Sequence, residues 1–530
     1  MSLPCARWAR IGGPRDGAAP ASGSRTRARP CPCCRADPVQ GAAAGAAAFA
    51  TRALFEGMHS GGPLSLTGLT VLAGAGAMIA VTRIAARYLG ESIGQDYARQ
   101  IRAALFEHAA RMPASAVAER RAGYMSLRFV GDMTAFRNWV GLGLPRLVAG
   151  SVLIPAMLVT LWLLDPIFAL AVVPVFGITL LAIALGGLRL IPLQRRLRVR
   201  RARIAADMAE RMPLAPRLDR LGRRGKELAQ LDKRTEAMIR AALRHRLSAE
   251  TLNALPDLAA GIAAALVILT GHRAGLGPGS IAAALAVLGL LLSPLRDLGG
   301  VWNHRAAFRA AAIKAHAALS RQKRDLYRAG QGLPKGPVDV TFEDVPLPSG
   351  PSLNLHTKGG TETHLAIDEL DARAVRDMLL GLDTPTAGRI LLSGVDLRDL
   401  SRGSLRRNVQ CLSATPELLQ GSLRRALLMG CDHRPDEATL EHLARDLGLG
   451  PLLDRLGGLS GTVLEGGKNL THTERLAISL ARVRLSQPKL LLLGPEVDES
   501  IRMRLSSHLR RRNTTVIQLG SARQAISTAA

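Results

Sequence analysis

Five long apolar runs constrain the fold of this chain more than any other feature of its sequence. They are Leu64–Val81, Leu147–Leu164, Ile167–Leu188, Leu258–Gly271 and Ser280–Leu295. A helix needs about 20 apolar residues in succession to span the hydrocarbon core of a bilayer, and these runs approach or exceed that length. Buried helices of a soluble protein are the alternative, but the second and third runs form a hairpin too long and too apolar for an ordinary core. The sequence therefore predicts an all-α membrane domain.

The connections between these runs alternate in length and charge. Gly90–Val140 and Arg189–Glu250 are long, polar and helical in pattern, and the second carries 18 lysine or arginine residues. The connections at Asp165–Pro166 and His272–Gly279 are short and nearly uncharged. Because positive charge marks the cytoplasmic side of a bilayer, we expect both long connections to be cytoplasmic and both short ones external. Gly41–Leu54, which is rich in alanine, would be a sixth, truncated or marginal span.

The charge balance bears on the partner. The net charge is +28, from 70 Lys plus Arg against 42 Asp plus Glu, which is typical of proteins that bind nucleic acid or an anionic membrane surface. Nucleic-acid binding would also require aromatic stacking platforms, and aromatic residues make up only 3% of the chain. Together with the apolar runs, this composition favours membrane lipids as partners and predicts no nucleic acid.

The first 40 residues are rich in Arg, Pro, Gly and Cys and have no apolar core, so they do not resemble a signal peptide. We expect residues 1–40 either to be disordered or to result from a wrongly assigned translation start. Within them Cys31–Cys34 (CPCC) invites a metal site, but no second Cys or His pair lies nearby, and no bound metal is expected. Cys411 and Cys431 are expected to be reduced thiols.

Beyond residue 325 the pattern of the sequence changes. Short strand-like runs alternate with helix-like segments, which is typical of an α/β domain. The strand-like runs are Val338–Phe342, His364–Ile367, Arg389–Leu392, Val409–Leu412, Leu490–Leu493 and Thr515–Leu519. We therefore expect a membrane domain over residues 41–325, a Gly/Pro-rich linker over 326–337 and an α/β domain over 338–530.

Three segments carry a resemblance to a known family. Leu379–Gly394 reads LLGLDTPTAGRILLSG, and Glu465–Pro488 reads EGGKNLTHTERLAISLARVRLSQP. Ile101–Leu147 resembles the family's first cytoplasmic loop, with the matching residues Gly123, Arg128 and Asp132. Over roughly residues 61–521 the chain resembles an exporter-type ABC half-transporter, a membrane domain fused to a C-terminal ATP-binding cassette. The resemblance implies five to six transmembrane helices with long cytoplasmic extensions, followed by an α/β P-loop-type ATPase-like domain.

The phosphate-binding loop that this resemblance implies lacks its ligands. The family's Walker A loop is Gly-rich and ends in Gly-Lys-Ser/Thr, so that backbone N–H groups and the lysine hold phosphate and the hydroxyl holds magnesium. The loop falls on Ile367–Val375, which contains no Gly, Lys, Ser or Thr, and Ala372 stands at the lysine position. Asp368, Glu369 and Asp371 place carboxylates where a triphosphate would sit, and like charges repel. Asp371 could instead cap the following helix.

The other nucleotide motifs also depart from the family. The residues at the implied positions are Ala414 for the glutamine loop, Leu470–Glu474 (LTHTE) for the LSGGQ signature, Gly494 and Pro495 for the Walker B carboxylates, Ser521 for the switch histidine, and Pro346–Leu347 for the adenine-stacking aromatic. Glu496 or Asp498 could be a shifted Walker B pair, although Pro495 disturbs the local backbone. The sequence therefore predicts no catalytic, cofactor-binding or metal-binding residue in this chain. ATP and magnesium are implied by the family only, through a partner subunit.

These observations predict a subunit of an ABC exporter-like complex that is catalytically inactive and forms a homo- or heterodimer with another half-transporter. A non-transporting scaffold or regulator, and a decayed gene product, are the alternatives. The expected location is the cell (inner) membrane, multi-pass, with the C-terminal domain cytoplasmic; the substrate is not identified. Exporters of this family pass force through short helices at the tips of their cytoplasmic loops. One tip is expected at Met212–Arg217, where Pro213 and Pro216 interrupt the long helical pattern and make a turn, and the other around Ala114–Arg120.

Overall fold

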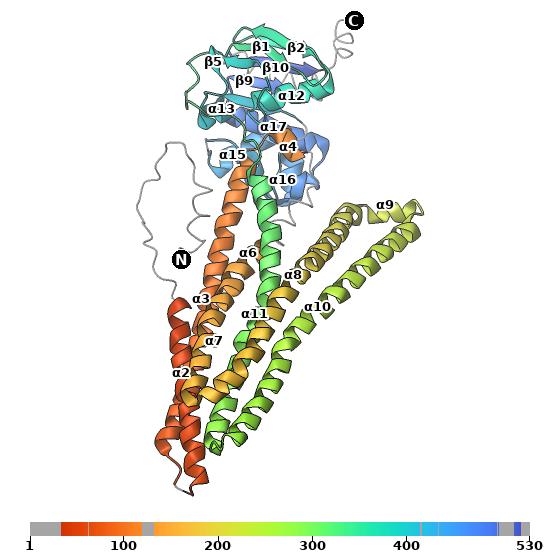
Figure 1. Cartoon of the computed structure of the whole chain (residues 1–530). Coiled ribbons are helices and arrows are strands. Elements are labelled where there is room, and N and C mark those ends of the chain that lie inside the picture. Colours follow the sequence, from red (N-terminus) through yellow and green to blue (C-terminus); the bar gives the residue numbers. More distant parts are fainter. Residues whose placement is uncertain are drawn as a thin grey trace. The chain divides into compact units, whose positions relative to one another are not determined.

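The structure, a computed structural model, describes residues 33–61, 63–118, 132–413, 416–432, 434–494, 497 and 513–520. The described residues divide into two units (Figure 1). A helical unit contains residues 33–110 and 132–321, and an α/β unit contains residues 111–118 and the described residues from 322 to 520. The short segment 111–118 therefore belongs to the α/β unit, although the long helices before and after it do not.

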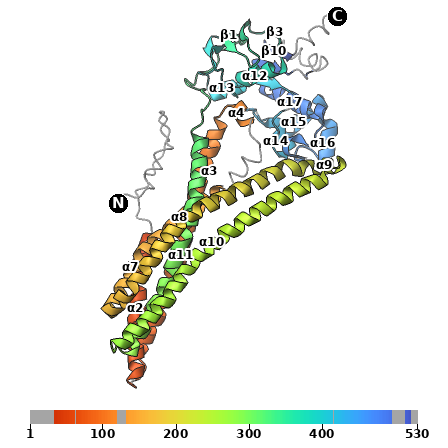
Figure 2. The ribbon, with the colours of Figure 1, turned by 45° about the vertical axis from the view of Figure 1, so that its right-hand side comes forward.

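Long helices build the helical unit (Figure 1, Figure 2). They are α2 (Cys33–His59), α3 (Leu66–Ala110), α7 (Leu144–Leu164), α8 (Pro166–Arg211), α10 (Arg224–Arg273) and α11 (Pro278–Leu319), and α7 directly follows α6 (Met133–Asn138) and η2 (Trp139–Gly143). In the described part of the chain, five helical segments are long and apolar enough to cross a membrane. These five contain four of the apolar runs in full and the first from Leu66 onward, so the predicted membrane-domain architecture is confirmed.

Helix α2 completes the bundle without being one of those five segments. It packs against α3, α7 and α11, and Ala44 and Ala48 are buried in the core of the unit. A Cβ added at Gly41 would lie 3.3 Å from Ala156 Cβ, so small residues are what allow α2 to approach α7 closely. The helix begins at Cys33, so the boundary that we expected after residue 40 falls inside it.

The helix breaks lie where the sequence predicts them. Asp165 separates α7 from α8, and its side chain accepts a hydrogen bond from Ile167 N at 2.9 Å, which caps α8. Pro166 follows as the first helical residue, where its missing N–H costs nothing. Residues 274–277 connect α10 to α11, with Gly275 at a φ of 66°.

Helices α8 and α10 run side by side and extend together to a tip (Figure 2). The tip is formed by η3 (Met212–Leu214) and α9 (Ala215–Arg220), which confirms the predicted short helix at Met212–Arg217. Arg211 and Glu227 form an ion pair of 2.7 Å next to the tip, and Arg234 pairs with Asp207 behind it. Met212 is 67% exposed and Leu214 is 41% exposed.

The α/β unit contains two larger sheets. Strands β1 (Val340–Pro346), β2 (Ser352–Thr357), β4 (Arg389–Leu392) and β5 (Val395–Asp396) form an antiparallel sheet in the order β2-β1-β4-β5. Strands β3 (Glu362–Ala366), β6 (Val409–Leu412), β9 (Leu490–Leu493) and β10 (Thr515–Gly520) form a parallel sheet in the order β3-β10-β9-β6. A short pair, β7 (Gly421–Ser422) and β8 (Thr462–Val463), lies elsewhere in the unit.

Helices surround these sheets and form a second core beside them. They are α4 (Ala114–Ala118), α12 (Glu369–Leu379), α13 (Arg402–Asn408), α14 (Leu423–Leu428), α15 (Glu437–Ala444), η4 (Arg445–Leu449), α16 (Gly450–Leu456), η5 (Glu465–Gly467) and α17 (His472–Ser486). Leucines and alanines of α14 to α17 form one buried cluster, while Val375 and Leu379 of α12 pack onto the sheets. The expected α/β fold is therefore confirmed.

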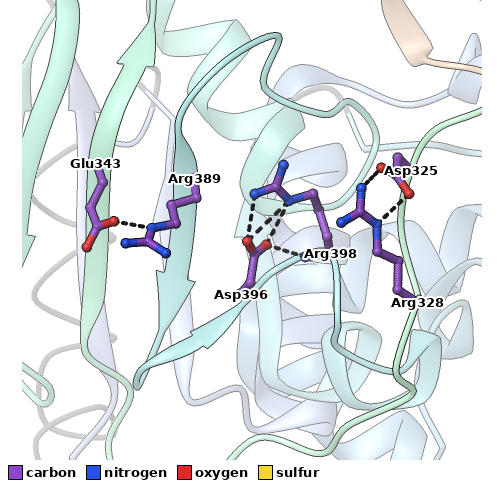
Figure 3. Close-up of polar contacts among 6 residues, drawn as sticks. All are labelled: Asp325, Arg328, Glu343, Arg389, Asp396 and Arg398. Carbon is purple, nitrogen blue, oxygen red and sulfur yellow. Dashed lines mark hydrogen bonds and ion pairs between the residues drawn. The ribbon is translucent and has the colours of Figure 1, made fainter.

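The linker that we expected over residues 326–337 lies on the α/β unit. Gln331 N donates to Asp399 O at 2.9 Å, and Arg328 N donates to Arg398 O at 2.8 Å. Figure 3 shows the ion pairs along this edge, Asp325–Arg328, Asp396–Arg398 and Glu343–Arg389. Burial alone would raise the pKa of Asp396, but hydrogen bonds and charge from Arg398 hold that pKa below its ordinary value.

Candidate functional site

The connection between β3 and α12 is where a phosphate-binding loop would lie. Strand β3 ends at Ala366 and α12 begins at Glu369, so only Ile367 and Asp368 join them. Ile367 N still donates to Gly520 O of the neighbouring strand at 3.0 Å, and Asp368 O already accepts from Ala372 N at 2.8 Å. Both connecting residues are thus occupied by sheet or helix hydrogen bonds, and no Gly-rich loop stands between the two elements.

The carboxylates at the start of α12 have different environments. Asp368 is the N-cap residue, but its side chain makes no capping hydrogen bond, and Glu369 forms only a 3.7 Å ion pair with Arg373 on the exposed face. Asp371 is 3% exposed. It lies in the first helical turn, where a negative charge is favourable, yet it does not cap α12 as we suggested from the sequence.

Asp371 instead holds the turn between β1 and β2. Its Oδ1 accepts a hydrogen bond from Ser349 N at 3.0 Å, and its other oxygen accepts from the Ser349 hydroxyl. In the same turn Leu347, at the position implied for an adenine-stacking aromatic, is 9% exposed and packs into the core. Ala372, at the implied lysine position, is 5% exposed. The β1–β2 turn and the first turn of α12, between which the family's nucleotide would be expected, are therefore joined by hydrogen bonds.

The N-terminus of α17, which carries the LTHTE segment, bonds to its own side chains. Thr471 Oγ1 accepts from Glu474 N at 3.2 Å, and Glu474 accepts from Thr471 N at 2.7 Å, a reciprocal capping box. Arg455 reaches both Glu474 carboxylate oxygens, at 2.7 and 2.8 Å. Burial alone would raise the pKa of Glu474, but hydrogen bonds from Thr471 and Arg455 lower it below its ordinary value.

Among the remaining implied positions, Gly494 is described, and it follows strand β9. All four residues of β9 are buried, and Gly494 N donates to Leu412 O at 3.0 Å beyond the end of the strand. Ala414, Pro495, Glu496, Asp498 and Ser521 lie outside the described residues, as do Gly123 and Arg128 of the first loop. Asp132 is described and pairs with Lys314 at 3.7 Å. Cys31 and the side chains of Cys33 and Cys34 are also outside the described part.

The first predicted tip forms α4, and α4 contacts the turn that follows α12. Ala114 N donates to Leu382 O at 2.9 Å, and Ser115 Oγ donates to Asp383 Oδ2 at 2.5 Å. Leu382 N and Asp383 N both donate to Asp377 O of α12, at 2.7 and 3.0 Å. Sequence reasoning placed the tip at Ala114–Arg120 but gave no sign of its contact residues, because a tertiary hydrogen bond leaves no local pattern.

Ser349 and Arg455 were also missed. Ser349 lies 22 positions from Asp371 in the chain, and Arg455 lies 19 positions from Glu474. Serine in a Pro-rich turn and arginine on a short helix are ordinary residues in those places. A signal existed only for Thr471 and Glu474, whose spacing is that of a capping box.

Comparisons with known proteins agree with this arrangement. Residues 49–294 match the family of the ABC transporter transmembrane region, and residues 375–499 match the ABC transporter family. The chain is 22% identical over 455 residues to an ATP-dependent lipid A-core flippase of Albidiferax ferrireducens, which covers 81% of this chain and 78% of the flippase. The fold is that of a bacterial Atm1-family ABC exporter solved with ATP bound, with a TM-score of 0.77, 18% identity, and coverage of 93% of this chain and 91% of that one.

Other relatives match over part of their length. The chain is 30% identical over 243 residues to a mycobactin import ATP-binding/permease protein of Mycolicibacterium thermoresistibile, 44% of this chain and 41% of that protein. It is 26% identical to a multidrug efflux ATP-binding/permease protein of Mycobacterium tuberculosis, over 49% of this chain and 23% of that protein. The chain thus spans less than half the length of these two relatives.

Proposed function

We propose that this chain is a transport subunit without ATP hydrolysis of its own. The premise is that the chain is an exporter-type ABC half-transporter, with its transmembrane region ahead of its ABC domain. It pairs with a second half-transporter that hydrolyses ATP. The observation that carries this proposal is the two-residue connection between β3 and α12, together with the Asp371–Ser349 hydrogen bonds that join α12 to the β1–β2 turn.

The side chains at the start of α12 do not fit the triphosphate of magnesium ATP. The N-cap residue Asp368 and the first turn of α12, with Glu369 and Asp371, offer three carboxylates, and the position for a phosphate-binding lysine is a buried alanine. A charge-assisted hydrogen bond contributes roughly 1.5–3 kcal/mol. Because about 1.4 kcal/mol is a tenfold change in affinity, losing three such contacts weakens binding by a factor of at least about a thousand.

The N-terminus of α17 supports the same proposal from the partner's side. In this family two ATPase domains close head to tail, each lending its signature segment to the other's Walker A loop. Here the Thr471 and Glu474 amides donate to each other's side chains, so the Glu474 carboxylate takes an N–H group at the helix N-terminus that a phosphate could otherwise accept from. A nucleotide held by the partner would therefore gain little from this helix, and hydrolysis would depend on the partner's own residues.

Nucleotide binding is the direct test of this proposal. The full-length chain, purified in a non-ionic detergent, should show no ATP hydrolysis, and calorimetry should give a Kd for magnesium ATP no tighter than about millimolar. A half-transporter with an intact Walker A loop serves as the positive control. Micromolar, magnesium-dependent binding by this chain would refute the proposal and would mean that the phosphate site lies elsewhere.

We also propose that the subunit lies in the inner membrane with its C-terminal domain and long basic connections in the cytoplasm. The support is the arginine-rich stretch around Arg203, on the part of α8 beyond its apolar run. In intact cells an Arg203→Cys variant should resist a membrane-impermeant thiol reagent, whereas a Gly275→Cys variant in the short turn should react. Labelling of position 203 from outside would contradict this topology.

A further inference from the structure

The chain enters the α/β unit at two places, and both entry segments bind the same short turn. The first entry segment, residues 111–118, follows α3 and contains α4. The second entry segment, residues 322–328, follows α11 and leads into the linker. The turn that both bind is residues 381–383, directly after the C-cap residue of α12. Two segments that are far apart in the sequence thus meet on three consecutive residues.

The first entry segment is held by its backbone, by a hydroxyl group and by a buried side chain. Ala114 N donates to Leu382 O at 2.9 Å, and Ser115 Oγ donates to Asp383 Oδ2 at 2.5 Å. Met112, two residues before α4, is 5% exposed. Because burial of an apolar side chain favours the packed state, this segment is anchored on both sides of the start of α4.

The second entry segment reaches the turn through Arg324, whose Nη1 donates to Gly381 O. Gly381 is buried and has a φ of 65°. A Cβ at this position would lie 2.5 Å from Leu405 Cδ2 and 3.5 Å from Leu326 Cδ1. The glycine therefore lets the chain after Arg324 pack closely against the turn.

The residues after Arg324 are fixed as well. Tyr327 has a φ of 65°, a conformation that a residue other than glycine keeps only where its surroundings hold it. The guanidinium of Arg402 lies 5.5 Å from the centre of the Tyr327 ring. The second entry segment is thus bound at two neighbouring points of the α/β unit.

Arg324 also binds the first entry segment directly, because its backbone N–H donates to Arg111 O at 2.7 Å. The backbone of this one residue therefore holds the first entry segment, while its guanidinium holds the turn to which that segment is bonded. Hydrogen bonds from a charged donor are stronger than those between neutral groups, and bonds within one network stabilise one another.

We propose that Arg324 is a positioning residue that makes the two entry segments bind the turn after α12 as one element. The segments engage this turn together and release it together, because each loses shared hydrogen bonds when the other leaves. Two independent anchors would open separately. The coupling needs no nucleotide, so it goes beyond the proposed function and holds whether or not the chain hydrolyses ATP.

Amide hydrogen exchange of the full-length chain in a non-ionic detergent tests this coupling. Arg324→Met keeps an aliphatic stem and removes the charged donor, so exchange should become at least about tenfold faster in both entry segments. Arg324→Lys, which still supplies a charged donor, should restore most of the protection. Lys323→Met, a change at the exposed neighbouring residue, is the matched control and should alter neither segment. Faster exchange in residues 322–328 alone would overturn the proposal.

A change in the first entry segment tests the coupling in the reverse direction. Ser115→Ala removes the hydroxyl that bonds to Asp383, so independent anchors would give faster exchange in residues 111–118 only. Coupled segments should give exchange that is also about threefold faster in residues 322–328. An unchanged second segment would refute the coupling, even if Arg324→Met does not fold.

Two further readouts separate coupling from a loss of stability. Protection of β9 and α17 should be the same in all these variants, because neither element belongs to the contact. The double variant Ser115→Ala/Arg324→Met should exchange no faster than Arg324→Met alone, whereas additive effects would contradict a shared network. Since every measurement is made without nucleotide, failure here is distinguishable from ATP hydrolysis by the chain.

Discussion

The two ends of helix α12 have different hydrogen-bond partners. At its first turn, Asp371 bonds to Ser349 and Ala372 is buried, in the place where a triphosphate would bind. Beyond its last turn, Leu382 and Asp383 receive α4 through two hydrogen bonds. One end thus lacks the chemistry of the family, while the other forms a well-ordered contact with a loop tip. Under the proposed function, nucleotide binding and docking of the loop tips are therefore separable properties of this one short helix.

The largest effect is expected at the second loop tip, on η3 and α9. Replacing Leu214 and Pro216 with Asp should abolish assembly of the complex, because the exposed apolar tip would carry two charges into a docking surface. Native mass spectrometry after purification in detergent measures the assembled fraction.

The control for this prediction is the other region of the comparison. Asp368→Ala and Glu369→Ala alter exposed side chains at the nucleotide end and should leave assembly unchanged. The reverse pattern, with sensitive carboxylates and an indifferent tip, would point to a repurposed nucleotide site and against a structural half-transporter.

A smaller effect is expected at the bond between α12 and the β1–β2 turn. Asp371→Ala leaves the Ser349 N–H without its acceptor, so the free energy of unfolding of the α/β unit should fall by about 1–3 kcal/mol. Thermal unfolding of the full-length chain measures the loss. Asp368→Ala, an exposed change on the same helix, should stay within about 0.5 kcal/mol of the parent. Equal effects of the two variants would show that the Asp371–Ser349 contact contributes nothing.

The smallest effect concerns pH and the N-terminus of α17. The pKa of Glu474 is lowered in the folded chain. The ionised carboxylate therefore stabilises the fold at pH values above 4.5, the ordinary pKa of this group. This contribution is lost as the pH falls through the lowered value. Glu474→Gln should therefore lower the melting temperature at pH 7, and the difference from the parent should shrink as the pH falls below 4.5. A difference that is constant with pH would exclude this linkage.

Regular local patterns were predictable from the sequence. The runs Arg389–Leu392, Val409–Leu412 and Leu490–Leu493 form strands over the expected residues, because short apolar runs between turn residues leave few alternatives. The two-residue strands β5, β7 and β8 were missed, since so few residues carry no periodic signal, and the longer strand β2 was missed as well.

The contacts that shape the candidate site were not predictable in the same way. The absence of Gly, Lys, Ser and Thr from Ile367–Val375 can be read from the sequence. The hydrogen-bond partner of Asp371 cannot, because this contact depends on how the β1–β2 turn and α12 pack together. Likewise α2 begins earlier than expected, since its alanines and glycines pack by small size and carry little apolar signal.

The two-residue connection between β3 and α12 also limits what mutation could do to this chain. Restoring the missing lysine by one substitution, Ala372→Lys, would direct an ammonium group into a position where the present side chain is 5% exposed. A phosphate-wrapping loop would further require residues to be inserted, and the serine on the β1–β2 turn would have to release its acceptor. Under the proposed function, no single substitution at this connection would supply a phosphate-binding loop, because residues would have to be inserted as well.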